Sequence, residues 1–134
     1  MPSESNQAAL VVGGEVAGIQ AALDLADSGI TVHLVESSPF LGSNGATVVP
    51  QHLLNTHLLQ TAKHPNIRVW TNTRINRFAG TAGQFHVELR QYPRYVDLTR
   101  CTACGDCLEV CPVPLPATGR KAIDLLPDTQ PGCA

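Results

Sequence analysis

The sequence has few aromatic residues and little charge. Of its 134 residues, 4% are Phe, Trp or Tyr and 15% are charged, and the formal net charge is −2. The nine Lys and Arg residues are scattered, which excludes the dense basic surface typical of nucleic-acid binding. No apolar run approaches the ~18 residues that can span a membrane. The stretch MPSESNQAAL also lacks the basic and apolar regions of a signal peptide, so we expect a soluble, cytoplasmic protein.

The sequence also lacks the patterns of common catalytic sites. It contains no nucleophile elbow, no Walker loop and no HExxH pair of histidines. His52 and His57 fall in one predicted helix, but a spacing of five residues places them on different faces. We therefore expect no catalysis by this chain alone. Its length suits one domain with a small appendage, because a chain of this size buries roughly two-thirds of its unfolded surface.

The beginning of the chain predicts a β-α-β unit. The stretch AALVVG predicts a strand, and TVHLVE predicts a second strand that ends at Glu36. Between them, VAGIQAALDLADSG predicts a helix, with Gly29 at the position of a left-handed cap. A unit of this length suits two parallel strands joined by a helical crossover. The apolar residues of the helix recur at helical spacing, at Val16, Ile19, Ala22, Leu23 and Ala26.

The middle of the chain predicts a second helix, a third strand and a hairpin. The helix fits VPQHLLNTHLLQTAKH, and HPNIRVW predicts the strand. The alternating runs INRF and QFHVELR, separated by AGTAG, predict an antiparallel β-hairpin. Further on, GRKAIDLLP predicts one short strand. The leucines that we expect on one stripe of the helix are Leu53, Leu54, Leu58 and Leu59.

Four of the five cysteines lie in the run CTACGDCLEVCP. Their spacing, C-x2-C-x2-C-x3-C-P, matches the pattern with which bacterial ferredoxins hold an iron–sulfur cluster. Zinc sites separate their cysteine pairs by more residues, and a thioredoxin-type pair would not have two further cysteines beside it. We therefore predict one [4Fe-4S] cluster, with Cys133 as an alternative fourth ligand. The predicted ligands are Cys101, Cys104, Cys107 and Cys111.

The stretch VVGGEVAG is similar to a dinucleotide-binding loop but departs from it at one position. In the G-x-G-x-x-G pattern, the first glycine makes the turn, the second lets the backbone approach the pyrophosphate, and the third lets helix and strand pack closely. Gly13 and Gly18 keep the first and third roles, and Glu36 stands where an acid binds a ribose hydroxyl. Glu15 takes the middle position, where two unit charges about 4 Å apart would repel by about 4 kcal/mol. The loop by itself favours a β-α-β unit that packs well and binds no dinucleotide.

The order of these segments resembles the N-terminal part of the heterodisulfide reductase A family and its relatives among the iron–sulfur flavoproteins. The matching pieces are VVGGEVAGIQAALDLADSG, VHLVESSPFLG, AKHPNIRVWT, GQFHVELRQYPRYVD and CTACGDCLEVCPVPLP followed by RKAI. This resemblance implies a flavin-binding domain interrupted by a ferredoxin-like insert, with electrons passing between flavin and clusters. It also implies that the four clustered cysteines are cluster ligands. The residues that it implies for FAD contact are Gly13, Gly14, Gly18 and Glu36.

The sequence departs from this family pattern in three places. Glu15 stands where the family has glycine, and SNGATVVPQHLL lacks the cysteines that the family carries there. The chain also stops just after the ferredoxin-like insert, which predicts a truncated flavin domain. These departures weaken the expectation of FAD binding and leave the cluster ligands unchanged.

The segments together predict an α/β fold in two domains. Residues 1–95 are expected to form a partial Rossmann-type unit with a β-hairpin, and residues 96–134 a small ferredoxin-like iron–sulfur segment. The function predicted is that of a small electron-transfer subunit bound to other subunits of a redox complex. One alternative is an FAD-binding oxidoreductase subunit whose flavin site is completed by a partner chain. The other is a structural adaptor with a non-redox cluster.

Overall fold

The computed structural model describes residues 8–42, 50–97, 99–102, 104–116 and 121–123. The chain forms two compact units, residues 1–92 and residues 93–134. The domain limits 1–95 and 96–134 stay a prediction. None of the helices in the described ranges is long and apolar enough to cross a membrane.

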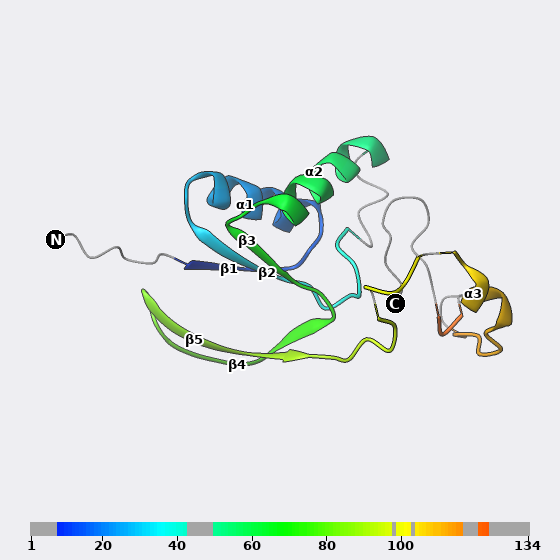
Figure 1. Cartoon of the computed structure of the whole chain (residues 1–134). Helices are drawn as coiled ribbons and strands as arrows, with labels where there is room; N and C mark the ends of the chain where they lie inside the picture. Colours follow the sequence, from blue (N-terminus) through cyan, green and yellow to red (C-terminus); the bar gives the residue numbers. More distant parts are fainter. Residues whose placement is uncertain (1–7, 43–49, 98, 103, 117–120, 124–134) are drawn as a thin grey trace. The chain divides into compact units, whose positions relative to one another are not determined.

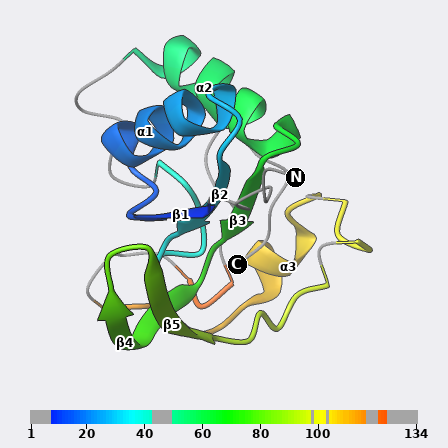
Figure 2. The same cartoon turned by 90° about the vertical axis from the view of Figure 1, so that its left-hand side faces the viewer.

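The first unit is built on a three-stranded parallel sheet in the order β1-β2-β3. Its strands are β1 (Ala8–Val12), β2 (Thr31–Val35) and β3 (Ile67–Trp70). Helices α1 (Val16–Asp27) and α2 (Gln51–Lys63) connect them and lie together on one face of the sheet (Figures 1 and 2). This arrangement confirms the predicted α/β class and the β-α-β unit.

The core of the first unit lies between the sheet and the two helices. Helix α1 follows its predicted apolar spacing, since four of its five predicted residues are buried and Val16 packs partly against them. Gly29, just beyond the helix, has a φ of +85°, which confirms the predicted left-handed residue. The buried core residues are Ile19, Ala22, Leu23, Ala26, Val32, Leu34, Leu41, Leu54, Leu58 and Ile67.

Helix α2 buries a narrower face than its leucines suggested. Leu53 and Leu59 are 47% and 56% exposed, so the prediction of one stripe of four leucines is wrong. The buried row consists of Leu54, Leu58 and Thr61, spaced by four and three residues. Helix α2 meets α1 along one row because the two helices pack side by side on the sheet, and the flanking leucines fall outside that contact.

A long antiparallel hairpin follows the sheet, with strands β4 (Thr73–Thr81) and β5 (Gln84–Gln91). The hairpin confirms the sequence prediction, but its strands extend into the expected AGTAG loop and leave a tight turn. Glycine explains the extension, because a Cβ at Gly80 would collide with the carbonyl oxygen of Gln84 across the hairpin. Gly83, in the turn, has a φ of +89°, where a side chain would be strained.

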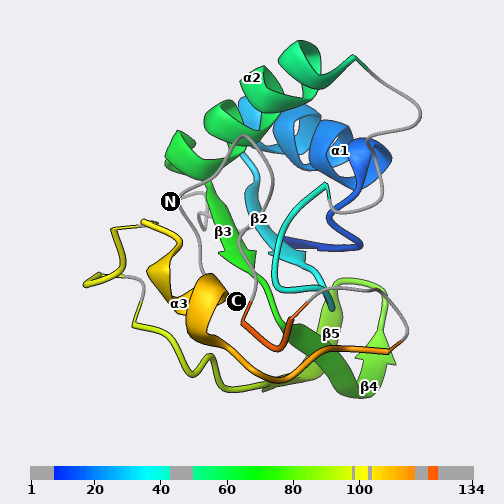
Figure 3. The ribbon, with the colours of Figure 1, turned by 90° about the vertical axis from the view of Figure 1, so that its right-hand side faces the viewer.

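The described residues of the second unit include a short helix, α3 (Asp106–Val110), drawn in gold in Figure 3. An isolated antiparallel β-bridge joins Pro114 and Lys121. The short strand predicted for GRKAIDLLP falls mostly outside the described residues, and Lys121 is the part of it that pairs.

Candidate functional site

The glycine loop connects β1 to α1 and is held at several backbone atoms. Gly13 has a φ of +104°, which favours glycine, and its N–H group donates to the carbonyl of Val35 at 2.8 Å. The carbonyl of Gly14 accepts a hydrogen bond from the N–H group of Gly42 at 2.7 Å. The loop is therefore tied both to β2 and to the segment that follows β2.

Two further glycines are required by close packing. A Cβ at Gly18 would collide with the carbonyl oxygen of Gly13, so helix α1 can lie against the loop only without a side chain there. A Cβ at Gly14 would collide with a methyl group of Leu41 and press on the side chain of Glu36. Gly18 thus has the packing role that its place in the pattern predicts.

Glu15 lies in the loop with an ordinary backbone. Its φ of −82° and ψ of 178° are extended values that any residue can adopt, and its carbonyl accepts the N–H group of Ile19 at 2.9 Å. Helix α1 therefore begins normally after Glu15. The loop therefore accommodates a carboxylate at this position without backbone strain.

Glu36 follows β2 directly and turns its carboxylate toward the loop. The residue is only 5% exposed, and its carboxylate accepts hydrogen bonds from the N–H groups of Gly14 and Ser38, the latter at 2.6 Å. The hydroxyl group of Ser37 donates to the same carboxylate at 3.2 Å. Burial opposes the charged form, but the backbone hydrogen bonds outweigh it and lower the pKa of the Glu36 carboxyl group. The structure thus brings Glu36 and Gly14, which are 22 positions apart, into direct contact.

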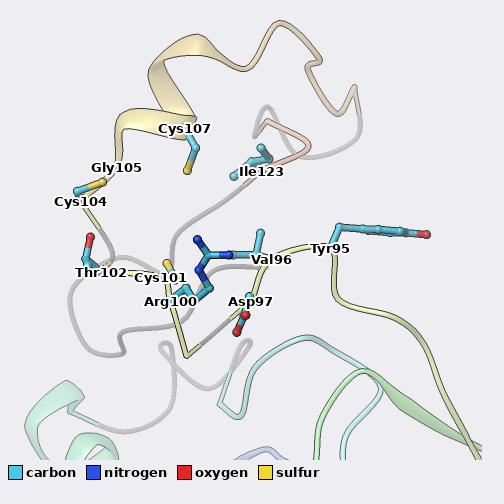
Figure 4. A pocket seen from close by; sticks show the side chains of 10 residues that line it. All are labelled: Tyr95, Val96, Asp97, Arg100, Cys101, Thr102, Cys104, Gly105, Cys107 and Ile123. Carbon is cyan, nitrogen blue, oxygen red and sulfur yellow. The ribbon is translucent and has the colours of Figure 1, made fainter.

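The cysteine segment surrounds a cavity of about 460 Å³ in the second unit. Three of the four predicted ligands line it, Cys101, Cys104 and Cys107, together with Arg100 and Asp97 (Figure 4). Gly105, between two of these cysteines, has a φ of +87° and precedes α3. Its left-handed conformation lets the chain turn sharply from Cys104 into the helix that carries Cys107.

The cysteines are not all in the same state. Cys104, Cys107 and Cys111 are free thiols, whereas Cys101 is in a disulfide. Within the described ranges, no three His, Cys, Asp or Glu side chains lie close enough together to hold a metal ion. The donor set nevertheless fits an iron–sulfur cluster, because such clusters take cysteine thiolates as ligands and three of these residues share one cavity. Binding through all four requires Cys101 in its reduced form. Cys133 lies outside the described residues.

Cys111 lies at the C-cap of helix α3, and its surroundings favour the thiolate form. Hydrogen bonds with the backbone of Val113 and Ile123 lower the pKa of its thiol, and the positive charge of Lys121 adds to this effect. The Lys121 ammonium group donates to the carbonyl groups of Leu108 and of Glu109, the latter at 3.2 Å. Lys121 therefore stabilises the carboxyl end of α3 beside the last predicted ligand.

Two residues of this segment were not found by sequence reasoning. Asp97 builds the turn before the cysteines, since its carboxylate accepts the N–H and hydroxyl groups of Thr99 at 2.9 and 2.7 Å. Its carbonyl accepts the N–H group of Cys101 at 3.0 Å. An Asp two residues before a Thr is a recognisable turn signal, but no local pattern points to Lys121, whose role depends on a contact across the segment.

Comparisons with known proteins agree with the fold. A family model described as FAD dependent oxidoreductase matches residues 9–113. A CoB--CoM heterodisulfide reductase iron-sulfur subunit of Methanopyrus kandleri is 41% identical over 121 residues, which cover 84% of this chain and 18% of that protein. A second such protein of the same organism is 44% identical over 116 residues, which cover 81% of this chain and 18% of that protein. The resemblance to the heterodisulfide reductase A family is thus confirmed, and the chain spans less than a fifth of the length of these relatives.

Among solved structures, a FAD-dependent pyridine nucleotide-disulphide oxidoreductase from Desulfovibrio vulgaris is similar, with a TM-score of 0.49 and 25% identity. The match covers 62% of this chain and 20% of that one. The family model extends from β1 through the cysteine run and includes the glycine loop and every residue that lines the cavity except Ile123. The chain therefore belongs to the family of FAD dependent oxidoreductases.

Proposed function

We propose that this chain carries electrons through one [4Fe-4S] cluster, within a redox complex that contains other subunits. The observation that carries the proposal is the ferredoxin spacing of four cysteines, three of which line one cavity. The names of the similar proteins, which are iron–sulfur subunits of heterodisulfide reductases, support it. The ligands proposed are Cys101, Cys104, Cys107 and Cys111.

The residues around the cavity suit this role. The turn at Asp97 places Cys101, and the left-handed Gly105 turns the chain between Cys104 and Cys107. Lys121 holds the end of α3, and backbone hydrogen bonds with Val113 and Ile123, helped by the charge of Lys121, lower the pKa of Cys111, which favours the thiolate that a metal requires. A bound cluster would supply reversible uptake of one electron. The chain then orients four thiolates around one site and performs no bond-breaking chemistry of its own.

The test is the metal content of the native complex, purified without oxygen. We expect iron and sulfide at this site and, after reduction by dithionite, a paramagnetic signal that Cys104→Ala removes. Cys111→Ala should also remove it, whereas Cys133→Ala should leave it unchanged if Cys111 is the fourth ligand. Zinc at these thiolates, or unchanged iron in Cys104→Ala, would contradict the proposal. A cluster that dithionite cannot reduce would make this segment a structural adaptor.

A second function is favoured by the glycine loop, which is shaped to receive the ADP part of FAD. Gly13 and Gly14 form a tight turn between β1 and α1, Gly18 lets α1 pack closely against that turn, and Glu36 lies beside it. In this proposal the Glu36 carboxylate accepts a ribose hydroxyl group. Glu15 opposes binding, because its charge near the pyrophosphate would cost about 4 kcal/mol if held about 4 Å away.

Titrating the full chain with FAD separates this function from the first. We expect weak binding by the wild-type chain and stronger binding by Glu15→Gly, by up to roughly a thousandfold if the whole repulsion is removed. Glu36→Ala should weaken binding in both backgrounds. Equal and undetectable binding by the wild-type chain and by Glu15→Gly would refute a role for this loop in holding FAD and leave the cluster proposal untouched.

A further inference from the structure

The cavity bordered by the cysteines also contains a permanent positive charge. Arg100 comes directly before Cys101 and lines the same cavity as Cys101, Cys104 and Cys107. Figure 4 shows its guanidinium group extending into this space rather than away from it. An arginine side chain stays protonated at all pH values at which proteins are folded. The cavity wall therefore carries a fixed cation beside the proposed ligands.

No other group in the described part of the chain neutralises this cation. The guanidinium group of Arg100 takes part in no hydrogen bond and no ion pair there. The one ion pair found in the described residues joins His64 and Asp27 in the first unit. Asp97 lines the same cavity, but the hydrogen bonds that its carboxylate accepts come from Thr99 and from the backbone of Arg100, within its own turn, and none comes from the Arg100 guanidinium group. The donors of Arg100 thus remain available to whatever fills the cavity.

Lys121, another cation of the second unit, is engaged elsewhere. The ammonium group of Lys121 donates to the carbonyl groups at the end of α3, and Lys121 does not line the cavity. Lys121 therefore acts on the position of helix α3 and on the thiol of Cys111. Among the cations that the structure describes in the second unit, Arg94, Arg100 and Lys121, only Arg100 lines the cavity.

We propose that Arg100 raises the reduction potential of the iron–sulfur cluster held in this cavity, an inference that rests on the proposed electron-transfer function. Reduction adds one electron, supplied by a reduced flavin or a reduced iron–sulfur protein, and the donor loses that electron. The cluster with its four thiolates gains one negative charge, and no bond is made or broken. A neighbouring cation stabilises this more negative form more strongly than the oxidised form, which shifts the equilibrium toward reduction.

The test compares Arg100→Gln with Arg100→Lys in the native complex, by redox titration followed through the paramagnetic signal. Arg100→Gln keeps a polar, shorter side chain and removes the charge, whereas Arg100→Lys keeps the charge. We expect Arg100→Gln to disfavour reduction about tenfold, which corresponds to about 59 mV for a one-electron couple. Arg100→Lys should stay within about threefold of the wild-type protein. Iron and sulfide contents should be the same in all three.

The outcomes separate this inference from the function on which it rests. If the wild-type complex contains no cluster, the proposed function fails. If the cluster is complete in Arg100→Gln and its potential is unchanged, or if Arg100→Lys shifts it equally, the role of Arg100 is refuted while the proposed function stands. Arg100→Met, which keeps most of the apolar stem, serves as a second neutral variant. If neither neutral variant assembles a cluster that Arg100→Lys holds, Arg100 serves assembly rather than potential, and the inference is overturned.

Discussion

Replacing Glu36 by Gln keeps the shape of the side chain and removes its charge at a buried position beside the glycine loop. The carboxylate accepts the N–H groups of Gly14 and Ser38 and the hydroxyl group of Ser37. An amide has only one oxygen, so at least one of these donors faces an NH2 group in the variant. The best arrangement leaves one buried N–H group unsatisfied.

The loss of stability expected for Glu36→Gln follows from this one unsatisfied N–H group. A buried donor left without a partner costs about 1–3 kcal/mol, and hydrogen bonds to a charged acceptor are worth more than those to a neutral amide. Removing the burial penalty of the charge offsets part of the loss, because Glu36 is only 5% exposed. We therefore expect Glu36→Gln to lower the free energy of unfolding of the first unit by about 2 kcal/mol at neutral pH.

The loss of stability caused by Glu36→Gln should become smaller as the pH falls. The pKa of Glu36 is lowered in the folded chain from its ordinary value of 4.5, so the folded state holds its proton less tightly than the unfolded state does. The stability that the charge contributes is complete above the unfolded pKa and is lost as the pH falls through the folded pKa. The gap between the wild-type chain and Glu36→Gln should therefore be widest at neutral pH and should narrow below about pH 4.5.

Urea unfolding followed by tryptophan fluorescence measures this difference. The chain has one Trp, Trp70 on β3, and its carbonyl accepts the N–H group of Glu36 at 2.8 Å. The fluorescence thus reports on the sheet that Glu36 adjoins. Glu88→Gln on the exposed hairpin is the matched control and should change stability by less than about 0.5 kcal/mol. A loss in Glu36→Gln as small as in the control, or one that grows as the pH falls, would refute the reasoning.

Two further pairs of substitutions test the packing of the first unit by the same assay. Gly18→Ala should destabilise by about 3 kcal/mol, because its Cβ would meet the backbone carbonyl of Gly13, whereas Gly29→Ala should cost about 1–2 kcal/mol for its left-handed backbone, since open space surrounds it. A smaller loss for Gly18→Ala than for Gly29→Ala would show that α1 does not need its close approach to the loop. Ile19→Ala should cost about 2–5 kcal/mol because Ile19 is fully buried. Val12→Ala is its control, since Val12 is 62% exposed, and equal losses at the two positions would contradict the described core.

Much of the fold could be predicted because it follows from local pattern. The spacing of apolar residues in α1 already identified the face that is buried, and Gly29 marked its end. Which leucines of α2 are buried could not be predicted from the local pattern. Leu53 and Leu59 are as apolar as Leu54 and Leu58, and only the position of α1 beside α2 decides which pair is covered.

The candidate site also combines features that the sequence predicts with features that it does not. The cysteine spacing and Gly105 are visible in the sequence, because a tight metal loop needs ligands close together and a residue that tolerates positive φ. The resemblance named Glu36 and Gly14 as residues for FAD contact, but the hydrogen bond between them was not predicted. Lys121 could not be found, because its hydrogen bonds reach residues 12 and 13 positions away with no regular pattern between them.

The sequence by itself determined the elements and the chemistry that the chain can offer, namely a β-α-β unit with a glycine loop and four thiols at ferredoxin spacing. Only the tertiary structure decided that the Glu36 carboxylate lies against Gly14 and that the Arg100 guanidinium extends into the cavity lined by cysteines. The physical reason is that helix and strand patterns are set by neighbours within a few residues. The partners of a buried carboxylate and the direction of a long side chain are instead set by the packing of segments far apart in the sequence.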